Sequence, residues 1–219
     1  MIAMILAAGR GERMRPLTDV TPKPLLTVRG ITLIEHLIGQ LAGAGFVDIV
    51  INIAHLGYMV EQHLGHGHQL GVRIRYSNEG PTGLETGGGI RRALPLLTSD
   101  PFLVVNGDIY TDYPFTGLPK RLQGPAHLVL VDNPAHNRQG DFGLDNGLVV
   151  NYGPRLTFAG IGVYRTALFA KIPEERFPLA PLLQEAIEQG EVTGEHHRGS
   201  WADVGTPGRL LALNRGYDG

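Results

Sequence analysis

The sequence alternates short apolar runs with helical patterns, and this feature most constrains the fold that the chain can adopt. The runs Ile2–Ala7 and Phe102–Val105 are apolar at consecutive positions, so both faces of each predicted strand should be covered. Between them, Leu33–Ala44 has apolar residues at helical spacing and precedes Gly45, which favours a helix end. Strands covered by helices on both faces form a parallel sheet, so we expect a three-layer α/β/α fold.

The second half of the sequence has a different pattern. From Pro125 onward, strand-like runs are joined by Gly, Asn and Pro turns, with fewer helices between them. This favours an antiparallel or mixed extension of the sheet that forms the second wall of a cleft. We expect one domain over residues 1–219 with a mixed, mostly parallel central sheet. The further predicted elements are strands at Val47–Ile53, Val72–Tyr76, Ala126–Val131, Leu148–Asn151 and Thr157–Tyr164, helices at Tyr58–Leu64 and Ala180–Gln189, a segment Thr86–Leu97 that begins flexibly and ends as a helix, a strand pair within Val192–Ala202, and a last helix from Pro207.

Composition and charge exclude several classes of protein. The chain has no cysteine, which excludes disulfides, thiolate metal sites and cysteine nucleophiles. A formal net charge of −2 gives no general attraction to nucleic acid or to an anionic membrane, so phosphate binding would need a local site. The first residues lack the basic segment of a signal peptide, and no apolar stretch approaches the roughly 20 residues of a membrane-spanning helix. We expect a cytoplasmic protein.

A glycine-rich loop follows the first predicted strand. Gly9 and Gly11 would let backbone N–H groups approach an anion, but Met14 replaces the third glycine of the dinucleotide-binding fingerprint. The G-x-x-x-x-G-K-[ST] motif of P-loop proteins is absent. Arg10, Arg13 and Arg15 lie close to the glycines, and an arginine fork suits phosphate oxygens. The loop therefore predicts a phosphate site of another kind.

Lys23 lies between two prolines, which predicts an extended backbone that holds its ammonium group on a stiff support. Such a lysine could meet a triphosphate, or it could be a solvated side chain in a surface turn. Taken alone, the motif leaves both readings open.

Two aspartates are candidate metal ligands. Asp108 follows the strand Phe102–Val105, at the sheet edge where ligands bind in α/β proteins. Asp203 precedes Thr206 and Pro207, which have the pattern of a helix N-cap and first helical position. Magnesium prefers one or two carboxylates together with substrate phosphates. Each aspartate alone could instead be an ordinary turn or cap residue.

Glycines are dense between Asn78 and Gly89, directly before a helical pattern. This density predicts that a planar or bulky ligand packs against bare backbone there. A mobile glycine loop is the alternative.

The stretch Leu6–Leu26, with Pro16, Thr18 and Pro22-Lys23-Pro24, resembles the signature of sugar nucleotidyltransferases. The resemblance continues at Asn106-Gly107-Asp108 and at Trp201-Ala202-Asp203-Val204-Gly205-Thr206. It implies a Rossmann-like fold of the nucleotide-diphospho-sugar transferase type, whose first half (about residues 1–125) binds the nucleotide and whose second half (about 126–219) binds the sugar. It also implies Mg²⁺ as the cofactor, held by Asp108 and Asp203.

The resemblance assigns further roles residue by residue. It implies that Arg13, Lys23 and Asp108 are catalytic. The implied nucleotide-binding residues are Leu6, Ala8, Gly9, Gly11, Arg13, Lys23, Glu79, Gly83 and Asn106. The implied sugar-binding residues are Glu85, Gly143, Thr157, Gly160 and Arg198.

One family motif is missing. Many relatives have Glu-Lys-Pro between the segments that contain Gly143 and Thr157, with the lysine on the sugar phosphate. This chain has Val150-Asn151-Tyr152-Gly153-Pro154-Arg155 instead. The cation for the acceptor phosphate is therefore open among Arg13, Arg155 and Arg198.

The segments Leu84–Gly89, Gly140–Phe142 and Gly194–His196 are most similar to family members that join UTP to N-acetylmuramate α-1-phosphate. That acceptor has a lactyl carboxylate, for which Arg198 is the candidate cation. The alternatives are a mannose- or heptose-1-phosphate guanylyltransferase, because Glu79 would suit guanine, and a non-catalytic nucleotide-sugar sensor. The expected partners are the nucleoside triphosphate and the sugar phosphate, and the expected state is a monomer or small homo-oligomer.

The remaining conspicuous side chains favour structural readings. His63, His66 and His68 cluster in a glycine loop without acidic partners, which predicts a solvated turn. His196-His197 predicts a strand with one exposed ring, and Trp201 predicts core packing.

Overall fold

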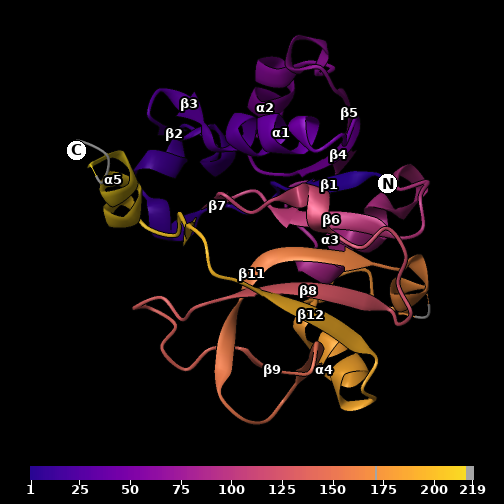
Figure 1. The fold of residues 1–219 in the computed structure, drawn as a ribbon. Coiled ribbons are helices and arrows are strands. Elements are labelled where there is room, and N and C mark those ends of the chain that lie inside the picture. Colours follow the sequence, from indigo (N-terminus) through magenta and orange to yellow (C-terminus); the bar gives the residue numbers. More distant parts are fainter. Residues whose placement is uncertain (171, 216–219) are drawn as a thin grey trace.

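The computed structural model describes residues 1–170 and 172–215. Its centre is a nine-stranded sheet in the order β5-β4-β1-β6-β11-β8-β12-β10-β9, with β11 also paired to β9 (Figure 1). The pairs β2–β3 and β7–β13 form two small sheets beside it. The strands are β1 Ala3–Leu6, β2 Thr27–Val28, β3 Ile31–Thr32, β4 Asp48–Ile53, β5 Arg73–Asn78, β6 Phe102–Asn106, β7 Ile109–Thr111, β8 Ala126–Val131, β9 Phe142–Asp145, β10 Leu148–Val150, β11 Arg155–Tyr164, β12 Val192–His197 and β13 Trp201–Asp203.

The first half of the chain builds the parallel part of the sheet. β1 lies between β4 and β6 and is parallel to both, and β5 is parallel to β4. Helices connect these strands, as predicted: α1 is Leu33–Gly43, α2 is Gly57–Leu64 and α3 is Glu85–Ala93. A capping box between Thr32 and Glu35 begins α1. The predicted flexible start at Thr86 is wrong, because Gly87, Gly88 and Gly89 all lie inside α3.

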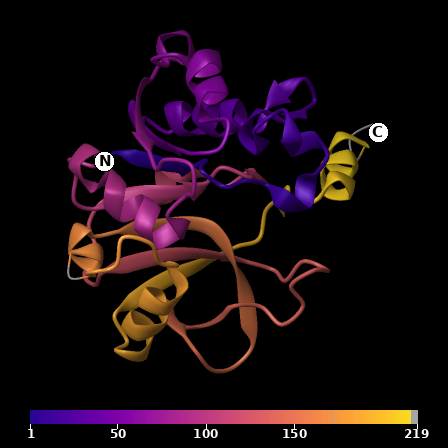
Figure 2. The ribbon, with the colours of Figure 1, turned by 180° about the vertical axis from the view of Figure 1, so that it is seen from behind.

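Two apolar cores separate the three layers (Figures 1 and 2). Neighbouring strand residues point to opposite faces, so Ile5 packs with Leu37 of α1 while Met4 packs with Ile90 of α3. The helix α4, Ala180–Glu188, covers the second face through Leu183. This two-sided burial explains the continuous apolar runs and confirms the expected α/β/α layering.

The second half extends the sheet mainly with antiparallel strands. β11 joins the halves, since it is antiparallel to both β6 and β8. β10 is antiparallel to β9 and β12, and β12 is parallel to β8. The sheet is therefore mixed, as expected, and most of its parallel pairings lie in the first half; in the second half α4 connects β11 to β12, and β12 is parallel to β8.

The end of the chain returns to the first half. The expected strand pair within Val192–Ala202 is wrong: β12 pairs with β8, whereas β13 pairs with β7. The last helix, α5 Pro207–Arg215, packs beside β2, with Leu210 and Leu213 against Met14 and Val28 (Figure 1). Residues 216–219 of the predicted domain lie outside the described residues. None of the helices within 1–170 and 172–215 is long and apolar enough to cross a membrane.

Candidate active site

A cavity of about 900 Å³ lies where β1, β4 and β6 end. Ligands bind at this carboxyl edge in open α/β sheets. Eleven predicted site residues line the cavity together with Arg10, Asn52, Thr82 and Arg176: Leu6, Ala8, Gly9, Gly11, Arg13, Lys23, Glu79, Gly83, Glu85, Asn106 and Asp108. The structure thus brings every residue predicted to bind nucleotide to one place.

The glycine-rich loop has a fixed shape. Gly11 has φ 66°, which favours glycine, and a Cβ there would meet Thr18 at 2.9 Å. The buried Thr18 hydroxyl donates to the Gly11 carbonyl at 2.7 Å. Arg10 and Arg13 line the cavity, whereas Arg15 pairs with Asp19 at 3.1 Å and does not. Two of the three nearby arginines therefore remain as candidates for phosphate contacts.

Lys23 extends toward Asp108, and its ammonium group forms an ion pair with the carboxylate. The lysine side chain is 13% exposed, so this is no solvated surface lysine. Its predicted extended backbone is wrong, because Lys23 begins a 3₁₀ turn, Lys23–Leu25, with Pro24 inside it. The prolines still fix the support, with Pro22 extended and Pro24 buried.

Glu79 is buried at the far side of the cavity and forms two hydrogen bonds through its carboxylate. Oε1 accepts from Asn52 Nδ2 at 2.5 Å, and Oε2 accepts from the backbone N–H of Leu84 at 2.7 Å. Asn52 also accepts from the backbone N–H of Ala7 at 2.7 Å. This chain of bonds links the glycine-rich loop to the segment before α3.

The glycines of α3 pack against the chain itself. A Cβ on Gly87 would lie 2.3 Å from the Phe177 ring, and one on Gly89 would lie 2.2 Å from Glu79 Oε1. The prediction that a ligand packs against these glycines is therefore wrong for α3. It stays open for Gly83, where the nearest neighbour of a Cβ would be Glu79 Oε2 at 3.8 Å.

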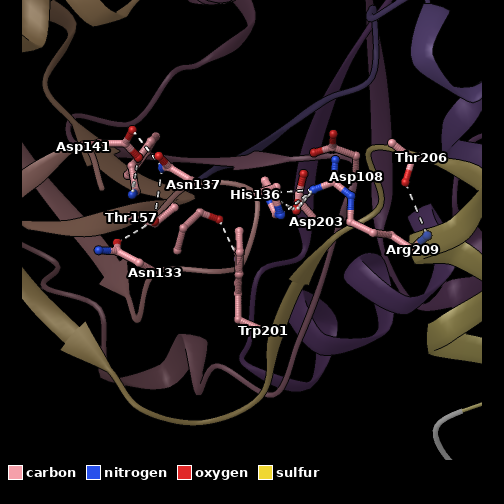
Figure 3. A network of polar contacts seen from close by, with 12 residues as sticks. Asp108, Asn133, His136, Asn137, Asp141, Thr157, Trp201, Asp203, Thr206 and Arg209 are labelled. Atoms are coloured by element: carbon pink, nitrogen blue, oxygen red, sulfur yellow. Dashed lines mark hydrogen bonds and ion pairs between the residues drawn. The ribbon is translucent and has the colours of Figure 1, made fainter. Parts of the chain in front are cut away.

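Asp108 and Asp203 lie together although they are far apart in the sequence (Figure 3). Asp203 is in register with Ile109 across the β13–β7 pair, and the Val204 N–H donates to the Asp108 carbonyl at 2.7 Å. Thr206 accepts from the Arg209 N–H at 3.4 Å, which confirms the predicted cap of α5. The last helix and its cap thus hold Asp203 beside Asp108.

The donor set suits magnesium. Among the described residues no group of three or more His, Cys, Asp or Glu side chains is arranged to hold a metal. Magnesium needs fewer protein ligands, because it keeps waters and uses substrate phosphates. Each carboxylate now faces a cation, Lys23 at Asp108 and Arg209 at Asp203. Each carboxylate could exchange its cationic partner for a divalent ion, so the two carboxylates together fit such an ion.

The residues predicted to bind sugar are less concentrated. Glu85 lines the cavity and pairs with Arg176 at 3.3 Å, and Gly160 packs against the Asn106 side chain. Thr157 faces the loop between β8 and β9, where its hydroxyl donates to Asn133 at 2.8 Å. Gly143 packs against the Tyr152 carbonyl, and Arg198 is exposed between β12 and β13. Of these five residues, only Glu85 lines the cavity.

A second polar cluster lies on β12. The Tyr113 hydroxyl donates to Glu195, and the His127 ring lies 3.8 Å from the same carboxylate. His127 is the largest influence that lowers the pKa of Glu195, and Tyr113 lowers it further, while burial opposes both. Burial and the neighbouring carboxylate raise the pKa of Tyr113, so its hydroxyl stays protonated.

The other histidines and Trp201 have structural roles. His196 pairs with Asp132 and His197 with Asp112, each at 2.9 Å, so the prediction of one exposed ring is wrong. His63 pairs with Glu35 at 3.2 Å, an acidic partner from α1 that the local sequence did not reveal. Trp201 packs against the first core and donates to the Ala159 carbonyl at 2.9 Å, as the core prediction expects.

The family model described as "Nucleotidyl transferase" matches residues 2–146. The chain belongs to the nucleotidyl transferase family. The N-acetylmuramate α-1-phosphate uridylyltransferase of Neisseria meningitidis serogroup B is 53% identical, over 96% of this chain and 95% of that protein. The enzyme of that name from Caulobacter vibrioides is 33% identical, over 96% of this chain and 94% of that protein. This nucleotidyl transferase is thus similar to both along nearly its whole length.

The fold of this nucleotidyl transferase is also found in solved structures. A protein described as a glucose-1-phosphate thymidylyltransferase from Bacillus anthracis superposes with a TM-score of 0.86 at 23% identity, covering 98% of this chain and 94% of that one. The expected nucleotide-diphospho-sugar transferase fold is confirmed.

The sequence analysis missed Asn52, which lines the cavity of this nucleotidyl transferase, and two residues that contact Asp203. Asn52 could have been noticed as a polar residue inside the apolar strand Val47–Ile53. His136 and Arg209, which contact Asp203, have no local motif that marks them. They meet only through the tertiary fold.

Proposed function

We propose that this enzyme transfers the uridylyl group of UTP to N-acetylmuramate α-1-phosphate, giving UDP-N-acetylmuramate and pyrophosphate. The single observation that supports this most strongly is 53% identity, over nearly the full length of both chains, to a protein of that name. The half around residues 1–125 would bind the nucleotide, and about 126–219 would bind the sugar, apart from β13 and α5, which pack on the first half. We also propose that the reaction belongs to the recycling of cell-wall sugars, a proposal that the N-acetylmuramate acceptor in the relatives' name supports.

The acceptor needs no general base. The second pKa of a phosphate monoester is about 6, so the acceptor is largely dianionic at neutral pH and is already a nucleophile. One of its oxygens would attack the α-phosphorus of UTP in line, while the bond from that phosphorus to the bridging oxygen of the β-phosphate breaks. Pyrophosphate leaves, and no proton is transferred.

The residues of the chain would align and neutralise the phosphates. Lys23 and Arg13 both line the cavity beside the glycine-rich loop, and their positive charges would offset the charge on the transferring group. The backbone of Ala8, Gly9 and Gly11 would approach the nucleotide closely. Asp108 and Asp203 would hold Mg²⁺, which supplies charge neutralisation between the donor and acceptor oxygens when it is bound.

The bonds of Glu79 do not choose between the bases. Its two oxygens accept bonds from Asn52 and Leu84, and each keeps a further lone pair for an N–H of uracil or of guanine. The preference for UTP over GTP therefore rests on the relatives named as uridylyltransferases.

A substrate panel tests the proposal. UTP and GTP are each combined with N-acetylmuramate 1-phosphate, N-acetylglucosamine 1-phosphate and mannose 1-phosphate, and pyrophosphate release is measured with Mg²⁺ present. We expect the highest kcat/KM for UTP with N-acetylmuramate 1-phosphate. A higher value for GTP with mannose 1-phosphate would support the guanylyltransferase instead. Binding of UDP-sugar without turnover of any pair would support a sensor.

The proposal also covers location and assembly. UTP is a cytoplasmic metabolite, so the reaction would take place in the cytoplasm. Every residue named for it comes from one chain, so a monomer would suffice.

A further inference from the structure

We propose that Arg209, held in place by His136, binds the phosphate of the acceptor. The inference rests on the proposed function, because it assigns a residue to the sugar phosphate of that reaction. It supplies the cation for which Arg13, Arg155 and Arg198 were the candidates.

The position of Arg209 supports this role. Its guanidinium group contacts Asp203, the carboxylate next to Asp108, and lies 2.8 Å from His136 Nε2 (Figure 3). A Cβ on Gly205 would lie 2.3 Å from Arg209 Nη2, and Gly205 lines the cavity. Arg209 does not itself line the cavity, but its guanidinium group packs against Gly205, which does, beside the carboxylate of Asp203.

Arg209 comes from α5, whereas His136 comes from the loop between β8 and β9, so the pair spans both halves of the molecule. That loop is fastened to β11 by Asn133, Asn137 and Asp141. Asn137 donates to Thr157 at 3.1 Å, and Asp141 accepts from the Phe158 N–H at 2.8 Å (Figure 3). A fastened loop fixes the His136 ring, and the ring in turn orients the guanidinium group.

The charges around Arg209 would allow its guanidinium group to exchange Asp203 for a phosphate. Asp203 Oδ1 faces both Arg209 and His136 Nε2, the latter at 3.0 Å. Arg209 donates to this oxygen, which a divalent ion would also use, whereas a His136 Nε2 that accepts from Arg209 has no proton to donate to it. A phosphate dianion arriving at this place could take both N–H groups of the arginine fork, a geometry that arginine provides and lysine does not.

The three candidates that the sequence left open are less well placed. Arg155 is exposed, and its Nη2 lies 3.4 Å from the Asn151 carbonyl, within its own hairpin. Arg198 is exposed on the connection between β12 and β13 and does not line the cavity. Arg13 lines the cavity, but it lies on the glycine-rich loop, on the nucleotide side.

The test compares Arg209→Gln and Arg209→Lys with Arg215→Gln, which removes the same charge from the exposed end of the same helix. Acceptor binding is measured by calorimetry on enzyme saturated with Mg²⁺ and an α,β-methylene analogue of UTP. We expect Arg209→Gln to raise the acceptor Kd and KM about 10- to 100-fold, with the KM for UTP within about twofold of wild type. Arg209→Lys should recover only part of the loss, and Arg215→Gln should match wild type.

A second acceptor distinguishes binding of the phosphate from binding of the lactyl carboxylate. N-acetylglucosamine 1-phosphate has the phosphate alone, so Arg209→Gln should weaken both acceptors by the same factor. A loss confined to N-acetylmuramate 1-phosphate, or an unchanged acceptor Kd, would overturn the inference. An equal rise in the KM for UTP would also overturn it, because it would mean that the variant disturbs the carboxylates.

His136 is tested as a positioning residue. His136→Ala should raise the acceptor KM about 3- to 10-fold with little change in kcat, and His136→Gln, which can still accept from the guanidinium group, should recover most of it. Recovery by neither variant, or a fall in kcat alone, would count against the role. Thermal unfolding of each variant confirms that it is folded. Failure of wild type to use N-acetylmuramate 1-phosphate would refute the proposed function, whereas normal wild-type turnover with an unaffected Arg209→Gln refutes only this inference.

Discussion

The nucleotide side and the acceptor side of the site are built in different ways. On the nucleotide side, Gly9 and Asp108 follow the parallel strands β1 and β6, and Lys23 reaches the same cavity from a turn before β2. On the side that we assign to the acceptor, Asp203 contacts Arg209 and His136. These two residues are 73 positions apart in the sequence. Strand ends place residues by local sequence, so they leave motifs. A site made of tertiary contacts leaves only isolated residues.

The largest effect is expected where the two sides meet. Asp108→Asn and Asp203→Asn should each lower kcat at least about 10²- to 10³-fold, because a ligand of the charge-neutralising ion is lost. Steady-state kinetics over a range of Mg²⁺ concentrations measures this. Asp48→Asn, which breaks an exposed pair with Arg73 at the sheet edge, is the matched control. Full activity of either aspartate variant would contradict the proposal that the two sides of the site meet at these carboxylates.

Lys23→Ala tests the nucleotide side. It should lower kcat/KM for UTP about 10²-fold, since it removes a nearly buried ammonium group that we propose to bind the phosphates. The acceptor Kd, measured by calorimetry, should change much less than it does for Arg209→Gln. If Lys23→Ala weakened the acceptor more than UTP, the two sides would not be separate.

Asn52→Ala tests the bonds between the loop and Glu79. It leaves the Ala7 N–H and Glu79 Oε1 without their partner, so it should destabilise the fold by about 1–3 kcal/mol. The KM for UTP should rise several-fold with little change for the acceptor. Urea denaturation and kinetics measure both quantities. Unchanged stability together with an unchanged KM would show that this link is dispensable.

The smallest effect concerns the pH dependence of stability on the acceptor side. The folded protein holds the pKa of Glu195 below its ordinary 4.5, so the stability that this group contributes is present above that pH and is lost as the pH falls through the lowered pKa. Glu195→Gln should therefore lose less stability than wild type between pH 7 and pH 4. The difference should be below about 1 kcal/mol, because solvent screens a partly exposed pair. Thermal unfolding at the two pH values measures it, and equal losses would contradict the assignment.

The same contrast explains how much the sequence could predict. Hydrophobic periodicity and apolar runs predicted β1, β4, β6 and α1. In β1, for example, the neighbouring residues Met4 and Ile5 pack into two different buried cores, so the strand is apolar at consecutive positions. The partner of β13 could not be predicted, since β12 is its neighbour in sequence and β7 is its neighbour in space. The glycines of α3 were misread because the Phe177 ring that fills the space above Gly87 is 90 residues away.

The prediction of the site residues was limited in the same way, by contacts between segments that are distant in the sequence. Asp108 and Asp203 were predicted together through a family resemblance and do lie together, whereas the sequence alone left open whether each is a metal ligand or an ordinary turn residue. Arg209 and His136 were not predicted, because a charge that faces another element has no pattern in its own segment.

The most direct test of the account is a crystal structure with Mn²⁺ and UDP-N-acetylmuramate, with the ion located by its anomalous scattering. The account predicts one peak bound by carboxylate oxygens of both Asp108 and Asp203, at about 2.0–2.3 Å. An ion that binds the diphosphate without contacting either carboxylate would contradict it.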